Sequence, residues 1–401
     1  MSEKNLIPEL RFPAFEKDGE WTVSSIDKLC DILNNIRKPV TSTNRTAGPY
    51  PYYGASGIID FIDKFLFDER LLLIGEDGAK WGAYDNTAFL VEGKYWVNNH
   101  AHVLKPIGID EKLLESYLVK LDLNPYITGA APPKLTLRKL KEIPVPVPST
   151  PEEQQKIASC LSSLDELIAA HKDKLDALKD HKKGLLQNLF PQEGETVPKV
   201  RFPEFEDDGE WVEKKLNTLS KRVIAKNRNG KFTAVFTNSA TAGIVDQRDY
   251  FDKDIANKKN LENYFVVQNG DYVYNPRISE HAPVGPLFKN RLGKTGVMSP
   301  LYTVFRFNEK NNDFYEYYFQ TSHWRNSIRA IANTGARFDR ISITASLFME
   351  IPVLYTGLME QQKIASCLSA VDELITAQQD KIEQLQQHKK GLMQGLFPSA
   401  V

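Results

Sequence analysis

Cysteine, long apolar runs and net charge are all scarce in this chain of 401 residues. The three cysteines, Cys30, Cys160 and Cys367, form no Cys-x-x-Cys pair, which argues against a zinc site or a disulfide framework and favours a reducing cytoplasm. The longest aliphatic run, Leu71 to Ile74, is far too short to cross a bilayer, and the N-terminus lacks the apolar core of a secretion signal. These shortages predict a cytoplasmic protein without a membrane partner.

Motifs for catalysis and nucleotide binding are also missing. The segment Leu292 to Thr295 ends like a phosphate-binding loop, but Phe288 stands where that loop requires glycine. No Gly-x-Gly-x-x-Gly segment opens a helical pattern, so a dinucleotide site is not predicted. His100 and His102 alternate on a predicted strand, yet no third ligand is spaced to complete a metal site with them. The sequence predicts a non-catalytic chain that binds no metal and no cofactor itself.

Charge is unevenly distributed along the chain. The formal net charge of the whole chain is only −1. Residues 212–350, however, contain 21 lysines and arginines against 13 aspartates and glutamates, a net charge of +8. A strongly positive segment inside a neutral chain is typical of a surface that binds a polyanion such as DNA.

A long internal duplication dominates the rest of the sequence. Residues 153–191 align with 360–398 without a gap, and about 27 of the 39 positions are identical. Both copies begin with EQQKIASCL, and a second repeat, RFPAFEKDGEW from Arg11 and RFPEFEDDGEW from Arg201, precedes each variable block. The repeats predict a first variable domain at 1–150, a helix at 151–191, a linker with the second variable domain at 192–357, and a second helix at 358–401.

Each repeated segment has the pattern of a long coiled-coil helix. Apolar residues recur at alternating steps of four and three over four to five heptads, and a proline closes each copy. Thr150 and Pro151 open the first copy, whereas Gly357 stands in place of Thr150 in the second. Polar residues interrupt both seams at matching places, His171 with Gln378 and Lys182 with Lys389. We expect the two helices to pair with each other antiparallel, about a pseudo-two-fold axis, which brings the C-terminus back to the N-terminal segment. The alternative is an ordinary amphipathic helix lying on each domain.

The two variable blocks mix short β-type runs with turn signals, so each is predicted to be an α/β or α+β domain with a small curved sheet. The predicted fold class is therefore two globular domains separated by two long antiparallel coiled-coil helices. Arginine can bond guanine through two atoms, and asparagine can do the same to adenine. On this basis the candidate DNA-binding residues are Lys80, Asn98, Asn99, His100, His102 and Lys134 in the first block, and Asn275, Arg277, Ser279, Arg337 and Arg340 in the second.

Together these features resemble the DNA-specificity (S) subunit of type I restriction–modification enzymes. The resemblance covers nearly the whole chain and rests on the doubled EQQKIASCL…DELI…HKKGL…LFP helices, the paired RFP segments and the IPVPVPSTPEEQQKIA junction. Blocks such as PYYGASG, NNHAHVL and GDYVYNPR look like the target-recognition domains of that family. The repeated segments then serve an identical partner twice, whereas the diverged blocks read different bases.

This resemblance implies a set of partners and a division of labour. Two methyltransferase subunits bind the helices, two restriction (translocase) subunits can join, and double-stranded DNA is read as a split, asymmetric site. S-adenosylmethionine, ATP and Mg²⁺ belong to the partners. Three alternatives stay open: a specificity subunit for a fused nuclease–methyltransferase polypeptide, an enzyme with an unrecognised active site, and a coiled-coil scaffold.

Overall fold

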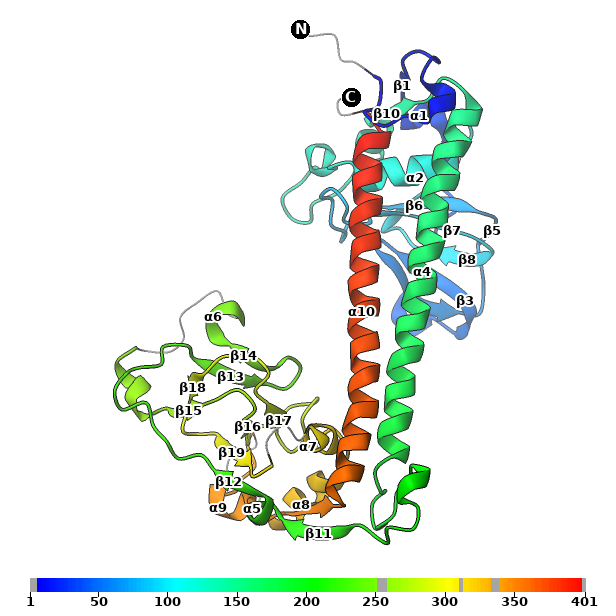
Figure 1. The fold of residues 1–401 in the computed structure, drawn as a ribbon. Coiled ribbons are helices and arrows are strands. Elements are labelled where there is room, and N and C mark those ends of the chain that lie inside the picture. Colours follow the sequence, from blue (N-terminus) through cyan, green and yellow to red (C-terminus); the bar gives the residue numbers. More distant parts are fainter. Residues whose placement is uncertain (1–5, 251–257, 310–312, 333–338, 399–401) are drawn as a thin grey trace. The chain divides into compact units, whose positions relative to one another are not determined.

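The computed structural model describes residues 6–250, 258–309, 313–332 and 339–398 (Figure 1). The chain divides into two compact units: unit 1 comprises Met1–Lys174 with Gln378–Val401, and unit 2 comprises Leu175–Ala377. Each unit contains one globular domain of helices and sheets and a part of each of two long helices, α4 (Pro151–Asn188) and α10 (Leu358–Leu396). The predicted mixed fold class is confirmed.

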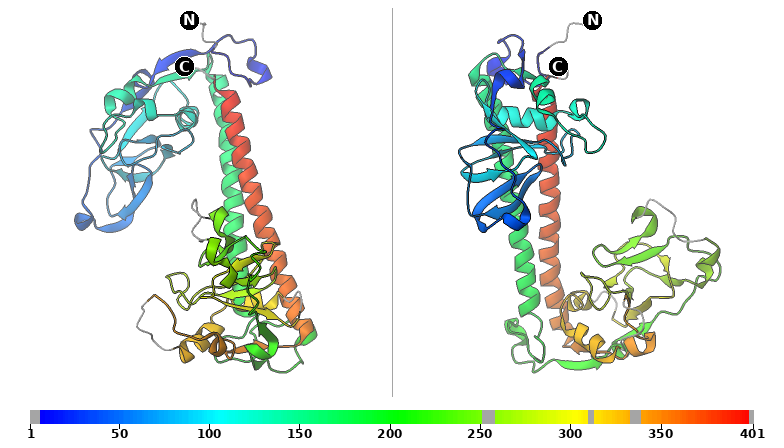
Figure 2. Two further views of the ribbon diagram at one scale, coloured as in Figure 1. Left: turned by 90° about the vertical axis from the view of Figure 1, so that its left-hand side faces the viewer. Right: turned by 180° about the vertical axis from the view of Figure 1, so that it is seen from behind.

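Within each unit the two long helices lie side by side and run antiparallel (Figures 1 and 2). In unit 1 Lys389 of α10 binds Asp165 of α4, while Gln378, earlier on α10, binds His171, later on α4. In unit 2 Lys182 of α4 binds Asp372 of α10 at 2.7 Å. The predicted antiparallel pairing of the two copies is therefore confirmed.

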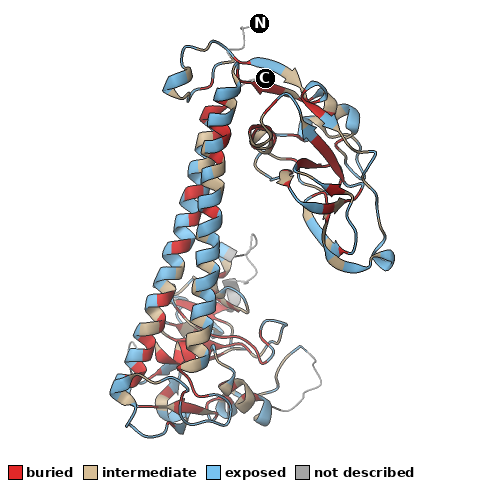
Figure 3. Ribbon diagram, turned by 90° about the vertical axis from the view of Figure 1, so that its right-hand side faces the viewer, coloured by how far each residue is buried: buried red, intermediate tan, exposed pale blue. Residues whose placement is uncertain are grey.

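All the matched polar layers of the seam are satisfied by partners on the opposite helix. The amide of Gln378 donates to the Nδ1 atom of His171 at 2.6 Å and to its carbonyl oxygen at 2.8 Å. Lys182 and Lys389 each face an aspartate, and these two aspartates, Asp372 and Asp165, are themselves equivalent in the repeat. Buried positions recur along both helices between exposed ones (Figure 3).

The helix ends pack identically in the two units. In unit 1 Phe397 at the end of α10 meets the ring of Trp21 edge to face, with centroids 6.2 Å apart. In unit 2 Phe190 at the end of α4 meets Trp211 with centroids 6.0 Å apart. Phe190 and Phe397 occupy the same position of the repeat, and so do Trp21 and Trp211. One helix end therefore fits both domains.

The repeated RFP segments are tied to these helix ends. The backbone N–H of Leu10 donates to the carbonyl of Gly395 at 2.8 Å, and that of Val200 donates to Asn188 at 2.9 Å. The first of these bonds joins the two ends of the chain within unit 1, as the sequence predicts. The second repeats the same contact across a continuous stretch of chain, so the internal junction reproduces the meeting of the termini.

The domain of unit 1 is built from two four-stranded sheets and a closing strand pair. Their strand orders are β2-β9-β6-β7 and β4-β3-β8-β5, while β1 pairs antiparallel with β10 where the chain enters and leaves the domain. The elements are β1 (Thr22–Ser25), α1 (Ile26–Leu29), β2 (Cys30–Ile32), β3 (Ala47–Gly54), β4 (Gly57–Ile62), β5 (Phe67–Asp68), β6 (Leu71–Gly75), β7 (Ala88–Val91), β8 (Lys94–Val97), β9 (Ala101–Pro106), α2 (Glu111–Lys120), α3 (Leu137–Glu142) and β10 (Pro144–Val147), with 3-10 helices at Pro13–Phe15, Ser42–Asn44 and Asn124–Tyr126.

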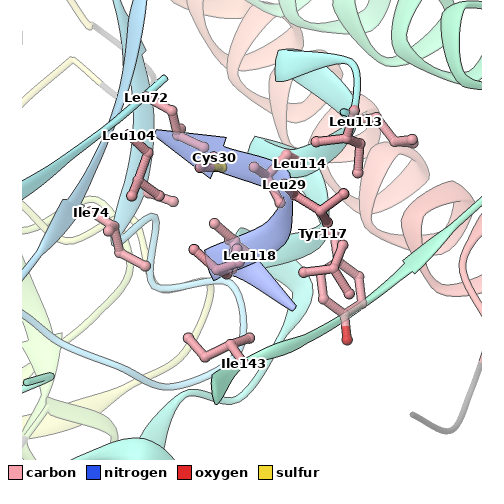
Figure 4. Packing of buried hydrophobic residues seen from close by; sticks show 14 of the residues in the cluster. Leu29, Cys30, Leu72, Ile74, Leu104, Leu113, Leu114, Tyr117, Leu118 and Ile143 are labelled. Atoms are coloured by element: carbon pink, nitrogen blue, oxygen red, sulfur yellow. The ribbon is translucent and has the colours of Figure 1, made fainter. Parts of the chain in front are cut away.

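The core of this domain lies between its first sheet and α2. Asp110 caps α2, since its carboxylate accepts from the backbone N–H groups of Lys112 and Leu113. The cap fixes the helix so that one apolar face meets the buried strand β6, whose five residues are all buried. Figure 4 shows the packing around Leu29, Cys30, Leu72, Ile74, Leu104, Leu113, Leu114, Tyr117, Leu118 and Ile143.

The domain of unit 2 has the same strand topology, with each strand number raised by ten. Its sheet β12-β19-β16-β17 matches β2-β9-β6-β7, and a parallel bridge from Val235 to Val297 joins the pairs β13-β14 and β15-β18 as β3 joins β8. The elements are β11 (Val212–Lys215), α5 (Leu216–Leu219), β12 (Ser220–Arg222), β13 (Phe236–Ser239), β14 (Gly243–Asp246), α6 (Gln247–Tyr250), β15 (Phe265–Val267), β16 (Tyr272–Tyr274), β17 (Leu287–Lys289), β18 (Gly296–Met298), β19 (Thr303–Phe307), α7 (Phe314–Tyr318), α8 (His323–Ile331), α9 (Ala345–Phe348) and β20 (Pro352–Tyr355), with 3-10 helices at Pro203–Phe205 and Lys258–Asn263.

Candidate nucleic-acid interface

The segment that follows the central strand lies at the same place in both domains. After β6 the backbone N–H of Leu135 donates to the carbonyl of Glu76 at 2.8 Å, and after β16 that of Ile341 donates to Pro276 at 2.9 Å. Isolated antiparallel bridges then pair Asp77 with Lys134 in unit 1 and Arg277 with Arg340 in unit 2. Asp77 is therefore the structural equivalent of Arg277, and Lys134 that of Arg340.

In unit 1 this strand end carries a compact group of charges, the strand-end cluster of Asp77, His100 and Lys134. The ammonium group of Lys134 lies 2.8 Å from one carboxylate oxygen of Asp77, and the His100 ring contacts the other. Burial raises the pKa of Asp77, but the hydrogen bonds from Lys134 and His100 outweigh it and hold that pKa below its ordinary value. The cluster therefore presents an ionised carboxylate flanked by the ammonium group of Lys134 and the ring of His100.

A second layer of side chains supports the cluster from within the domain. Arg37 pairs with Glu76 at 2.6 Å and donates to the carbonyl of Ala101 at 2.8 Å. His102 is fully buried, donates from Nε2 to the carbonyl of Leu135 at 2.7 Å and lies 2.8 Å from the Asn34 amide through Nδ1. Burial lowers the pKa of His102, in keeping with a neutral imidazole. In this conformation His102 holds the strand end in place and does not reach the surface.

The other candidates of the first block differ in exposure. Asn98 is buried, and its side-chain oxygen accepts from the backbone N–H of His100 at 2.8 Å, which shapes the turn that presents His100. Asn99 and Lys80 are exposed. His100 precedes β9, so the prediction that it alternates with His102 along one strand is wrong.

In unit 2 the strand end is more cationic. Asn275 is buried, donates to the carbonyl of Asn238 at 3.2 Å and accepts from the backbone N–H of Arg277 at 3.0 Å. Arg277 and Ser279 are exposed, and Arg340 is half-buried with its Nε atom 3.7 Å from Asp339. Arg337 lies outside the described residues. The structure brings Arg277 and Arg340 together beside a buried amide that orients the turn.

Sequence reasoning missed Arg37, Glu76 and Asp77. A signal for the two acids was present, because Glu76 and Asp77 follow directly on the buried run of β6, and side chains at the end of a central strand lie at the rim of a sheet. Arg37 left no such signal, since its contacts with Glu76 and Ala101 are long-range. Its role depends on the packing of the sheet.

The chain is similar to known proteins at three levels, which are a protein family, individual relatives and solved structures. A family described as the type I restriction modification DNA specificity domain matches residues 18–180. A type I restriction enzyme specificity subunit of Haemophilus influenzae is 36% identical over 149 residues, which cover 36% of this chain and 38% of that protein. The MjaVIII specificity subunit of Methanocaldococcus jannaschii is 21% identical over 95% of this chain and 93% of its own length.

Solved structures extend the similarity to the whole fold. The S subunit of a type I restriction–modification system from M. genitalium superposes with a TM-score of 0.60 over 98% of this chain and 100% of its own, at 14% identity. A chain from a study of complex assembly and conformational transition of the type I R-M system gives a TM-score of 0.52 over 95% of this chain and 98% of its own. At this level of identity the two structures establish the shared fold.

The fold is similar to that of an S subunit of a type I restriction–modification system. Residues 18–180 match the type I restriction modification DNA specificity domain, and the chain spans less than half the length of the Haemophilus influenzae relative that it matches. Among the described residues, no helix is both long enough and apolar enough to span a membrane.

Proposed function

We propose that this chain reads an asymmetric, bipartite site on double-stranded DNA and directs methylation of adenine, and cleavage, by partner subunits. The observation that supports this most directly is the pair of domains with one topology and different strand ends. Each domain reads one half-site, and the bases between the halves are not read. Two half-sites on one face of a duplex lie about 34–36 Å apart between centres.

The repeated helices are proposed to dock two methyltransferase subunits. A surface that meets the same partner twice must present the same side chains twice. Leu167 on α4 and Leu374 on α10 are equivalent in the repeat, and they are 43% and 55% exposed, so both helices present a leucine to solvent at the same position. Each is preceded by an exposed glutamate, Glu166 and Glu373. S-adenosylmethionine, ATP and Mg²⁺ are expected on partner subunits.

The stoichiometry of the complex tests this assignment. We expect the chain co-expressed with its methyltransferase to give a complex of one chain with two partners in native mass spectrometry. Leu167→Asp should remove one partner, because a charge replaces the apolar contact, and Leu374→Asp should remove the other. The combined variant should bind none.

Leu137→Asp is the matched control, since Leu137 is a similarly exposed leucine on α3 that lies outside the repeat. It should leave two partners bound. A complex that stays one-to-one at saturating partner, or loss of both partners from either single variant, contradicts the proposal of two equivalent docking surfaces.

Exchange of one domain should alter one half-site only. The paired strands β11 and β20 mark the natural boundaries, so residues 216–351 are replaced by the corresponding block of a relative. The methylated sequences of cells that carry the exchanged gene are then read by methylome sequencing. We expect the half-site read by unit 2 to change and the other half-site to persist. A change in both halves argues against independent reading.

A further inference from the structure

We propose that Asp77 and Arg277 are equivalent base-reading positions of the two domains, and that their opposite charges give the half-sites different bases at that point. This inference rests on the proposed function and names the chemistry that each position selects. Arg277 selects guanine. Asp77 selects a base that donates from an exocyclic amine in the major groove, adenine through N6 or cytosine through N4.

The two strand ends share one charged position and differ at another. The position opposite is cationic in both domains, Lys134 in one and Arg340 in the other. The position after the central strand is acidic in one and basic in the other, Asp77 and Arg277. The phosphate backbone is the same in every half-site, so residues that contact it should carry the same charge in both domains. A feature that differs between half-sites, the base edge, permits opposite charges.

Arg277 has the geometry for a direct base contact. Its side chain is exposed, and the buried amide of Asn275 fixes its backbone through a hydrogen bond of 3.0 Å to the Arg277 N–H. A guanidinium on a fixed backbone can donate two parallel hydrogen bonds to O6 and N7 of guanine, the acceptor pair that this base alone presents. The same group cannot pair with the amine of adenine or cytosine, which is also a donor.

Asp77 has spare capacity to accept from a base. Its two oxygens receive one hydrogen bond each, from His100 and from Lys134, and an ionised carboxylate offers about four acceptor sites. An exocyclic amine can occupy a remaining site. Guanine presents only acceptors toward the major groove, so a carboxylate placed there repels it. Lys134 and His100 keep Asp77 ionised, since their hydrogen bonds hold its pKa below the ordinary value despite burial.

Lys134 and Arg340 are the residues that contact the phosphate backbone in this scheme. Lys134 is 40% exposed at its side chain, so its ammonium group can also approach a phosphate while it stays beside Asp77. A phosphate contact contributes affinity without sequence preference and makes binding depend on salt. The pair in each domain thus combines one contact that orients the duplex with one that selects the base.

The test uses the full chain in its complex with the methyltransferase subunit. Bound sequences are selected from random double-stranded DNA, and the affinity of the best sequence is measured over a range of salt concentrations. The variants are Arg277→Asp, Asp77→Arg and Asp77→Asn for the reading positions, and Lys134→Ala and Arg340→Ala for the backbone positions. Arg228→Ala, an exposed arginine elsewhere in the second domain, is the matched control. Native mass spectrometry establishes that each variant assembles.

Arg277→Asp is expected to lose a guanine preference of about 5- to 150-fold at one position of one half-site, and Asp77→Arg to gain guanine in the other half-site. Asp77→Asn distinguishes the two amines: it keeps the preference if the base is adenine, which asparagine also pairs, and loses it if the base is cytosine. Lys134→Ala and Arg340→Ala are expected to weaken all sequences equally and to reduce the salt slope by about 1.

Two results overturn the assignment while leaving the proposed function intact. In the first, the wild-type complex selects a bipartite site but neither Arg277→Asp nor Asp77→Arg changes the preferred bases. In the second, these variants weaken all sequences equally and reduce the salt slope, which makes the positions backbone contacts. A wild-type complex that selects no sequence overturns the proposed function itself, and the reading positions with it.

Discussion

Arg11→Met is expected to destabilise unit 1 by about 3–5 kcal/mol, because it leaves the carboxylate of Glu153 buried without a cation. The guanidinium of Arg11 donates two hydrogen bonds to the carboxylate of Glu153, at 2.8 Å from Nε and at 2.9 Å from Nη2. The two side chains are only 6% and 1% exposed. Its remaining Nη1 donates to the carbonyl of Gly19 at 2.7 Å. The pair joins the N-terminal segment to the start of α4.

The double variant Arg11→Met/Glu153→Leu separates the net stability that the ion pair contributes from the destabilisation caused by a buried charge without a partner. Because two apolar side chains of similar size need no partner, the double variant is expected to recover most of the stability lost in Arg11→Met. Hydrogen exchange at β1 and β10, monitored by mass spectrometry, reports the loss within unit 1. An Arg11→Met protein with unchanged exchange at these strands contradicts the expectation.

The repeat supplies the matched control. Arg201 binds Glu360 with two hydrogen bonds of 2.8 Å, and its Nη1 donates to the carbonyl of Gly209 at 2.6 Å. Arg201→Met is therefore expected to raise exchange at β11 and β20 and to leave β1 and β10 protected. If each variant raises hydrogen exchange only at the paired strands of its own unit, the stabilising effect of each ion pair is confined to that unit.

A fragment of residues 1–194 is expected to form a homodimer and, with the methyltransferase, to methylate a symmetric site. The interhelical ion pair and the aromatic contact that α10 makes in unit 1 both have equivalents that a second copy of α4 can supply. Lys182 finds Asp165 of the other copy in place of Asp372, and Trp21 finds Phe190 in place of Phe397. The His171 layer changes its chemistry, since histidine meets histidine where it met Gln378.

Light scattering gives the mass of the fragment, and methylome sequencing gives its target. Asp165→Lys is expected to convert the dimer to a monomer, because it removes both interhelical ion pairs and sets lysines against lysines. Asp173→Lys, an exposed position on the same helix, should leave the dimer intact. A wild-type fragment that remains monomeric with its partner present shows that the two seams are not interchangeable.

The helices could be predicted from the sequence because their determinants are local and repeated. Pro151 starts α4 as expected, and the seam with its polar layers at His171 and Lys182 follows from the heptad pattern. The acidic partners Asp165 and Asp372 could not be predicted in the same way, since they lie beside the seam and meet their lysines only when the antiparallel register is known. The strand orders of the sheets, likewise, depend on pairings between distant segments.

The candidate site was only partly accessible to sequence reasoning. Exposed cations such as Arg277 stand out by residue type. His102 looked equivalent to His100 because both were placed on one strand, but β9 begins at Ala101, so the two side chains go to different environments. Asp77 was missed because a search for DNA-binding residues favours cations and amides, whereas its importance follows from its equivalence to Arg277.

The paired strands at the base of each domain have a consequence for the length of chain they enclose. Thr22 faces Val147 across β1 and β10, and Val212 faces Tyr355 across β11 and β20, so each domain leaves the helices and returns to them at neighbouring strands. The conformational entropy of closing a loop rises only with the logarithm of its length, by about 0.6 kcal/mol per doubling. Insertions between these strands are therefore nearly free of entropic penalty, which lets the second block be longer than the first without disturbing the helical pairing beneath it.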